Sequence, residues 1–118
     1  MIYHIATRRA WREALQRGEY RAESLKTEGF IHCSTNAQVV PVAERYYKGE
    51  RGLFLLMIDP SLLSSETKWE PPSGGTPTGV PETALFPHIY GPINLDAIVK
   101  IFDLISNPDG KYNLPVLD

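Results

Sequence analysis

The stretch Leu53-Phe54-Leu55-Leu56-Met57-Ile58-Asp59 contains the longest apolar run of the sequence, from Leu53 to Ile58. A continuous apolar run of strand length, closed by the turn residues Asp59-Pro60, is typical of a strand covered on both faces. A strand with one face in water alternates apolar and polar side chains instead. We therefore expect residues 53–59 to form the most buried strand of the fold.

The chain before this strand predicts a short strand followed by an amphipathic helix. Residues 2–6 are β-branched and aromatic, as strands prefer. Thr7 is suited to cap a helix, and Gly18 is suited to end it. Between them, apolar side chains recur at helical spacing on one stripe: Trp11, Ala14 and Leu15.

A second strand and a second helix are expected before the central strand. Residues 19–28 show no sustained hydrophobic periodicity, which predicts a loop or a short turn of helix. Residues 29–33 predict a strand. Thr35 and Gln38 have the spacing of a capping box. The apolar residues after them follow helical spacing: Val39, Val42, Ala43 and Tyr46. Pro41 is expected to bend this helix or to confine its regular part to the later turns.

The remaining segments predict further strands around one long loop. Extended segments are expected at 67–70, 85–90, 97–105 and 112–117. Residues 71–83 hold four prolines and three glycines and therefore predict a loop, long enough to act as a lid or a binding loop. Two main helices among several strands indicate an α+β fold with a mostly antiparallel sheet, formed by residues 1–118 as a single domain.

Composition narrows the classes of function. The chain has 118 residues, a formal net charge of −2 and an isoelectric point near 5.9, which argues against general nucleic-acid binding. No apolar run approaches the roughly 20 residues of a membrane-spanning helix. One cysteine and a start without a secretory pattern favour a reducing, cytoplasmic location. We expect no membrane partner, and a monomer or weak dimer.

The three histidines are the main candidates for chemistry. His4, His32 and His88 each lie in a short apolar, strand-like segment, and histidine is suited to acid–base work near neutral pH. Strand periodicity places Tyr90 on the same face as His88. These four residues are the candidate catalytic groups. The competing interpretation is half-buried histidines bonded within strands, and a three-histidine zinc site lacks support from spacing.

Two arginines at the start of the first helix are a second anomaly. Arg8 and Arg9 oppose the helix dipole there, at a cost of roughly 0.3–1 kcal/mol each. An anionic ligand at this position would account for them, but so would solvated side chains that reach acids on neighbouring segments. Cys33 is expected to be a buried, inert thiol, because strand neighbours such as His32 point to the opposite face.

Four ordered motifs carry a resemblance to a known family. They are Ile2-Tyr3-His4-Ile5 with Trp11; Gly18-Glu19-Tyr20 with Ser24-Leu25; Glu28-Gly29-Phe30-Ile31-His32-Cys33-Ser34 with Gln38; and Phe86-Pro87-His88-Ile89-Tyr90-Gly91-Pro92 with Asn94-Leu95-Asp96. Over nearly its whole length the chain resembles the small bacterial family catalogued as domain of unknown function 952. The family label supplies no activity.

That family in turn resembles the ADP-ribosyltransferase superfamily, which implies a split β-sheet core with a cleft for NAD. The resemblance implies that His4 contacts the nicotinamide ribose and that the unit 29–47 corresponds to the superfamily's second motif, whose aromatic residues stack on nicotinamide. It also implies that Tyr46 or Tyr47 stacks on nicotinamide. The third motif departs from the superfamily, because this region offers His88, Tyr90 and Asp96 where many members have a glutamate.

The expected function is therefore binding of NAD or another ADP-ribosyl compound. A divergent transferase of ADP-ribosyl or phosphoryl groups would use the strand histidines, with Arg8, Arg9, Ser34, Tyr46 and Tyr47 as ligand contacts and with no metal. One alternative is a non-enzymatic module that binds a protein or a small ligand through residues 71–83. A metal-dependent hydrolase is a further alternative.

Overall fold

The computed structural model describes residues 1–117, over which three α-helices combine with eight strands. The helices are α1 (Arg8–Arg17), α2 (Glu23–Thr27) and α3 (Asn36–Tyr46). All strand pairs are antiparallel. The expectation of an α+β fold with antiparallel sheets is confirmed. The two expected main helices are α1 and α3, and the short α2 is the turn of helix that was one of the two expectations for 19–28.

The strands form two three-stranded sheets and one two-stranded ribbon. The first sheet has the order β1-β4-β8, with β1 at Ile2–Thr7, β4 at Leu53–Ile58 and β8 at Ile98–Leu104. The second has the order β3-β6-β5, with β3 at Ile31–His32, β6 at Phe86–Tyr90 and β5 at Glu66–Glu70. The ribbon pairs β2 (Glu19–Tyr20) with β7 (Ile93–Asn94). A single bridge between Tyr3 and Ser34 links the two sheets.

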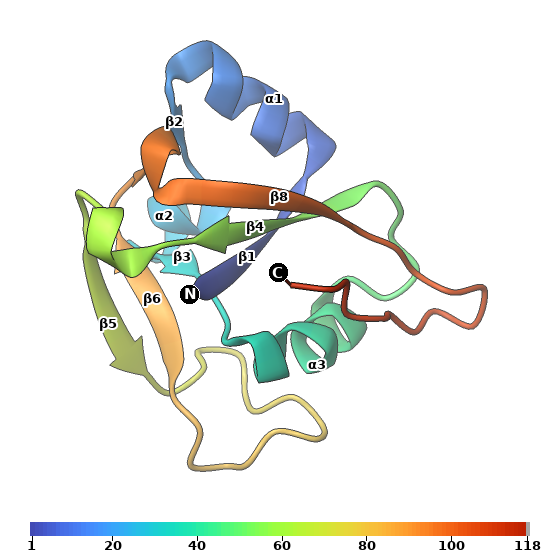
Figure 1. Cartoon of the computed structure of the whole chain (residues 1–118). Coiled ribbons are helices and arrows are strands. Elements are labelled where there is room, and N and C mark those ends of the chain that lie inside the picture. Colours follow the sequence, from blue (N-terminus) through green and yellow to red (C-terminus); the bar gives the residue numbers. More distant parts are fainter. Residues whose placement is uncertain (118) are drawn as a thin grey trace.

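Strand β4 lies at the centre of the first sheet, and its position explains the apolar run of the sequence. One face of this sheet packs with α1 in a cluster that includes Leu56 and Ile58. The other face packs against α3 in a second cluster that includes Leu55 and Met57. Figure 1 shows the sheet between these two helices. Because both faces are covered, nearly every side chain of β4 is apolar and buried, as the sequence predicts.

Helix α1 begins and ends where the sequence indicates. The Thr7 hydroxyl accepts a hydrogen bond from the Ala10 N–H at 3.1 Å, and Gly18 adopts φ 90°, the left-handed conformation that suits glycine. Ala14 is fully buried and Trp11 is partly buried. Leu15 was expected on the same stripe but is 57% exposed, because it lies at the solvent edge of the stripe.

Helix α3 is continuous from Asn36 although Pro41 lies inside it. The Gln38 carboxamide accepts a hydrogen bond from the Thr35 N–H at 3.0 Å, one half of the expected capping box. The expectation that Pro41 confines the regular helix to its later turns is wrong. Pro41 is the sixth residue of α3, so its missing N–H removes one helical hydrogen bond, to the Ala37 carbonyl, and the helix continues on both sides of it.

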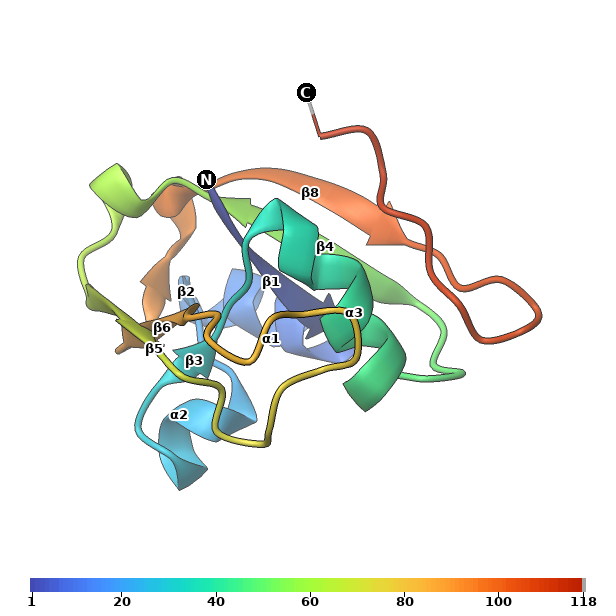
Figure 2. The same cartoon turned by 90° about the horizontal axis from the view of Figure 1, so that it is seen from below.

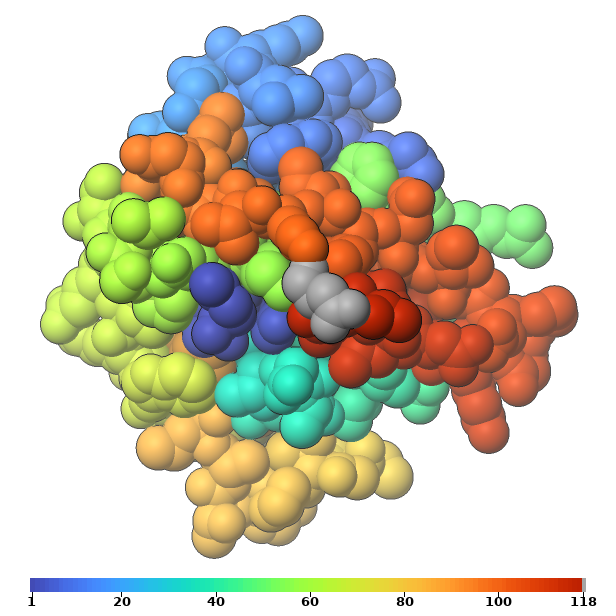
Figure 3. All heavy atoms as spheres, in the orientation of Figure 1, coloured from blue at the N-terminus to red at the C-terminus, as the bar shows by residue number. Residues whose placement is uncertain are grey.

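The segment 71–85 between β5 and β6 is irregular, as expected for its glycines and prolines. The loop runs alongside α3, as Figure 2 shows in a view from below. In the space-filling view of Figure 3, the loop is yellow and lies below the teal helix. Arg45 donates a hydrogen bond to the Gly74 carbonyl at 2.9 Å. Pro77 is buried. The loop is therefore packed against the domain.

Two expected strands are shorter than the sequence indicated, and a third is not formed. The strand expected at 29–33 is paired only at Ile31–His32, and Gly29 adopts φ 89° before it. A 3₁₀ turn at Leu95–Ala97 precedes β8. The strand expected at 112–117 is wrong, because over 112–117 only Tyr112 forms a bridge, to Ser106. Among residues 1–117, no helix is long and apolar enough to cross a membrane.

Candidate functional site

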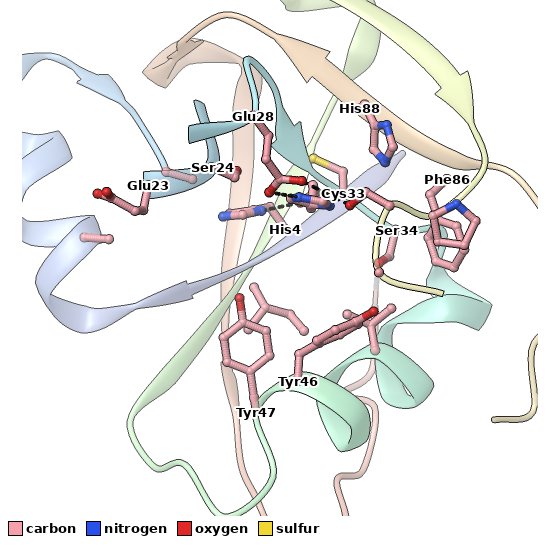
Figure 4. A pocket seen from close by; sticks show the side chains of 18 of the residues that line it. His4, Glu23, Ser24, Glu28, Cys33, Ser34, Tyr46, Tyr47, Phe86 and His88 are labelled. Atoms are coloured by element: carbon pink, nitrogen blue, oxygen red, sulfur yellow. Dashed lines mark hydrogen bonds and ion pairs between the residues drawn. The ribbon is translucent and has the colours of Figure 1, made fainter. Parts of the chain in front are cut away.

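A cavity of about 670 Å³ opens between the strand ends and α3. One wall comes from β1, β3 and β6, which contribute His4, His32 and His88. Tyr46 and Tyr47 lie on the opposite wall, at the end of α3 (Figure 4). The lining also includes Glu23 and Ser24 of α2 and the loop residues Pro72, Ser73, Gly74 and Pro77. The cavity therefore collects most of the residues singled out from the sequence.

His4 is buried, and both nitrogens of its ring are satisfied by the protein. Its Nδ1 lies 2.6 Å from the His32 carbonyl oxygen, which can only accept, so Nδ1 carries the proton. Its Nε2 therefore accepts a hydrogen bond from the Tyr20 hydroxyl at 2.8 Å. Burial lowers the pKa of His4 from 6.5 to about 4. His4 is thus neutral at neutral pH, with no free nitrogen for a ligand.

His32 lies at the mouth of the cavity in a bond to a carboxylate. Its Nε2 is 2.8 Å from Glu28 Oε2, and the two side chains are 42% and 38% exposed. The Ser73 hydroxyl donates to the other oxygen of Glu28 at 3.1 Å, which ties the loop to this pair. The hydrogen bond from His32 is the main cause that lowers the pKa of Glu28. Glu28 is therefore ionised at neutral pH.

His88 is held by a second carboxylate. Its Nδ1 lies 2.9 Å from Glu70 Oε1, and the Tyr90 hydroxyl donates to the same oxygen at 2.6 Å. The Phe30 ring stacks on the imidazole with 4.2 Å between ring centroids. The bond from Tyr90, followed by that from His88, lowers the pKa of Glu70. The pKa of Tyr90 is raised because its proton is held by the carboxylate.

His32 and His88 are direct cross-strand partners of β3 and β6. Residues directly opposite each other in an antiparallel pair point to the same face of the sheet. Their ring centroids are 5.4 Å apart, and Phe30 contacts both rings. The predicted placement of Tyr90 and His88 on one face of their strand is confirmed, and the β3–β6 pairing adds Phe30 and His32 to that face. Tyr90 lies on it outside the cavity lining, with Lys68 over its ring.

The remaining predicted ligand contacts within the cavity are Ser34, Tyr46 and Tyr47. Ser34 is buried next to the β3 end, and its side chain lies at the cavity in Figure 4. The Tyr46 hydroxyl lies 3.5 Å from the Gly75 carbonyl of the loop. Burial raises the pKa of Tyr47. Tyr47 therefore keeps its proton at neutral pH, and both side chains present a hydroxyl and a ring face to the cavity.

Arg8 and Arg9 lie outside this cavity. Arg8 pairs with Asp103 of β8 at 3.4 Å and places its guanidinium over the Phe54 ring. Arg9 pairs with Glu13 one turn along α1 at 3.8 Å. Arg8 thus reaches an acid on a neighbouring segment, as the simpler of the two interpretations expects, and Arg9 reaches one within its own helix. The structure does not bring them together with the histidines.

Sequence reasoning missed the two carboxylates Glu28 and Glu70. A signal for Glu28 was present, because Glu28 and His32 stand four residues apart within one recognised motif. No local signal exists for Glu70, which reaches His88 only through the β5–β6 pairing. Cys33 is buried, and burial raises the pKa of its thiol, as expected for an inert cysteine.

The charge of the lining restricts what the cavity can hold. Glu23 and Glu28 line it, and within residues 1–117 no lysine or arginine does. Its polar side chains are otherwise histidines, tyrosines, serines and Thr7. In the described part of the chain, no group of three or more His, Cys, Asp or Glu side chains is arranged to hold a metal ion. The site therefore offers hydrogen bonds, aromatic faces and a carboxylate.

Residues 5–101 match the model of a family described as protein of unknown function, DUF952. The chain belongs to this family. The crystal structure of protein CC0527 from Caulobacter crescentus is similar, with 31% identity and a TM-score of 0.80, covering 96% of this chain and 93% of that chain. The solution NMR structure of the same protein gives 31% identity and a TM-score of 0.74, covering 93% and 89%. No curated protein matches.

Proposed function

We propose that the cavity binds an ADP-ribosyl compound of the NAD type and that this DUF952 protein is a divergent transferase acting at the ribose. The observation that carries the proposal is the convergence of strand histidines and α3 tyrosines on one cavity. Its volume of about 670 Å³ lies within the range of roughly 300–1,000 Å³ usual for small-molecule sites. An aromatic wall opposite hydrogen-bonding groups suits a ligand with a flat base and a polyhydroxyl sugar.

Glu28 supplies the carboxylate that the third motif lacks. When the bond between nicotinamide and ribose breaks, its electron pair leaves with the nicotinamide nitrogen and positive charge develops on the sugar. A fixed negative charge beside that sugar stabilises the transition state more than the ground state. Glu28 lies in the cavity, and its lowered pKa keeps it charged at neutral pH. In the transferase, Glu28 is the group that faces the developing charge.

An NMR titration of the ¹⁵N-labelled chain with NAD, with ADP-ribose and AMP as controls, tests binding. Saturable shifts are expected at His4, at residues 29–34 and at Tyr47, with none at Arg9. The absence of shifts at millimolar NAD would mean binding weaker than about −4 kcal/mol and would contradict the proposal.

Release of nicotinamide from NAD tests the reaction itself. Glu28→Gln is expected to slow release at least tenfold while NAD still binds, because the amide keeps the shape of the side chain but lacks its charge. Glu13→Gln is the matched control, since Glu13 lies on α1 outside the cavity. Equal rates for the two variants would contradict the role of Glu28.

The loop favours a second candidate function, a binding module without turnover. Pro72, Ser73, Gly74 and Pro77 form part of the cavity wall, so a ligand in the cavity touches the loop directly. This alternative predicts that NAD or another small ligand binds without release of nicotinamide, and that deletion of 73–80 abolishes binding. Retained binding after the deletion would count against it.

A further inference from the structure

We infer that His88 is a general base whose Nε2 takes the proton from a neutral hydroxyl acceptor in the cavity, with Glu70 as its positioning residue. The inference rests on the proposed function for the identity of the group that is transferred. It adds the second half of the reaction, namely which residue activates the acceptor and what kind of acceptor the site takes.

The position of the His88 ring is fixed on three sides. Its backbone belongs to β6, its face stacks on Phe30, and its Nδ1 bonds to Glu70. Because an ionised carboxylate can only accept, Nδ1 carries the proton and Nε2 keeps its lone pair. Glu70 is itself fixed by the bond from Tyr90 to the same oxygen. A histidine oriented by a carboxylate in this way is prepared to accept a proton at its other nitrogen.

Nε2 of His88 is the atom that remains for a ligand. The His88 side chain is 97% buried, lines the cavity and forms no bond through Nε2 to any residue from 1 to 117. No side-chain nitrogen or oxygen in that part of the chain is both sealed from the surface and unpaired, so Nε2 must reach the cavity. A buried nitrogen with a lone pair and no protein partner is matched by a ligand that donates a hydrogen bond.

The other two histidines do not fit this role. His4 has both nitrogens bonded, to His32 and Tyr20, and would have to lose one bond before it accepted a proton. His32 is half exposed, and its bonded carboxylate is also tied to Ser73 of the loop. Only His88 combines a buried ring, a fixed proton position and a nitrogen at the cavity.

The chemistry of the cavity selects a neutral hydroxyl as the acceptor. An ionised carboxylate or phosphate has no proton for the lone pair of His88 Nε2 to accept, whereas a neutral hydroxyl has one. Ser34 is a second buried group with a side-chain oxygen unbonded within residues 1–117. It follows β3 by two residues and lines the same cavity as His88. Ser34 therefore offers a second hydrogen bond to a hydroxyl held near His88.

The step balances with NAD as the donor and an alcohol or water as the acceptor. The acceptor oxygen forms a bond to the ribose carbon, the carbon–nitrogen bond breaks, and neutral nicotinamide leaves with the electron pair. His88 Nε2 takes the hydroxyl proton and releases it to water afterwards. No oxidant, reductant or metal is required. Water as acceptor gives ADP-ribose, and methanol gives its methyl glycoside.

The first experiment needs no ligand. Long-range ¹H–¹⁵N NMR spectra of the full chain identify which ring nitrogen of each histidine carries the proton at pH 8. His88 is expected to be protonated at Nδ1, whereas free histidine prefers Nε2. Glu70→Gln should shift His88 toward the Nε2-protonated form, and Glu70→Asp should restore the Nδ1 form. A His88 protonated at Nε2 in the unsubstituted protein would overturn the inference.

The second experiment measures nicotinamide release and NAD affinity together, with water and with methanol as acceptors. His88→Gln is expected to slow release at least 100-fold and to change the dissociation constant for NAD less than threefold. His32→Gln should slow release far less. Glu70→Gln should slow release and Glu70→Asp should recover part of the rate, a rescue that loss of folding would not give.

The two proposals fail in distinguishable ways. If NAD does not bind, the proposed function is overturned. The NMR spectra still show whether the proton of His88 lies on Nδ1, as the inference requires, or on Nε2, which would overturn it. If NAD binds and is cleaved but His88→Gln keeps more than a tenth of the rate, the proposed function stands and the role of His88 is overturned. Thermal melting of each variant verifies that the chain is folded.

Discussion

Two buried histidines at opposite ends of the cavity wall show how neighbours decide what a side chain can do. His4 is 6% exposed and His88 is 2% exposed. His4 donates to a main-chain carbonyl and accepts from Tyr20, so it is closed on both sides. His88 donates to Glu70 and leaves Nε2 at the cavity. Similar burial therefore accompanies two bonded ring nitrogens in His4 and only one in His88.

The difference has a physical cause in the partners of each ring. A carbonyl and a hydroxyl satisfy a neutral imidazole but offer no negative charge to stabilise the imidazolium. An ionised carboxylate offers such a charge. His4 thus holds β1, β2 and β3 together, whereas His88 bonds to the Glu70 carboxylate at the cavity. Substitutions at the two ends should separate stability from activity.

The largest expected effect is the loss of stability on substitution His4→Ala. The variant leaves the Tyr20 hydroxyl and the His32 carbonyl without their partner and opens a cavity beside the α1 cluster. We expect a loss of about 3 kcal/mol in the free energy of unfolding, measured by urea denaturation. His32→Ala, at a half-exposed ring, is the control and should cost about 1 kcal/mol or less. Equal costs would refute the structural role of His4.

Acid should destabilise the protein through the same histidine. Burial lowers the pKa of His4 from 6.5 to about 4 in the folded chain, so between these values the unfolded chain binds a proton that the folded chain does not. Stability therefore falls as the pH falls from about 6.5 to about 4, by roughly 3 kcal/mol in total. Below that window His4 contributes no further loss.

Urea denaturation at several pH values between 7 and 4.5 measures this slope, and His4→Gln is the control that should flatten it. Glu28 and Glu70 act in a different window. Their lowered pKa values stabilise the fold above their ordinary value of 4.5, and that stabilisation is lost only as the pH falls below it. A slope that is the same in His4→Gln would assign the acid effect to groups other than His4.

A smaller effect is expected from Tyr20→Phe, which gives His4 one free nitrogen and so makes it more like His88. The lost hydroxyl leaves a buried nitrogen unpaired, and we expect a cost of about 1–2 kcal/mol in urea denaturation. It also removes a bond that stabilises the neutral ring, so the pKa of His4 should rise and the acid slope should decrease. Tyr90→Phe is the control at the His88 end and should leave that slope unchanged.

The sequence was sufficient for the elements that local patterns specify. The apolar run of β4, the Thr7 cap and Gly18 of α1, and the shared face of His88 and Tyr90 were all predictable, because each depends on residues within a few positions of one another. The strand expected at 112–117 failed for the opposite reason. A strand needs a partner edge, and the sequence of one segment does not show whether a partner is present.

The site was predictable in its histidines and tyrosines but not in its carboxylates. Glu70 and His88 are separated by the long loop, and their contact depends on the register that pairs Lys68 with His88 and places Glu70 at the diagonal position. A shift of one residue would send Glu70 to the opposite face. The distinction between His4 and His88 depends on the same kind of contact, since Tyr20 reaches His4 from a separate strand.

The smallest expected effect concerns the arginines that lie apart from both histidines. Arg9→Ala removes an exposed ion pair with Glu13, worth about 0.3–0.5 kcal/mol, and also a cation that opposes the dipole of α1, which costs roughly 0.3–1 kcal/mol. The two changes nearly cancel, so unfolding in urea should shift by no more than about 0.5 kcal/mol. NAD binding should be unchanged, because the cavity lies elsewhere. A tenfold weaker affinity would instead place an anion site at the start of α1, and would mean that the ligand extends well beyond the wall that holds His4 and His88.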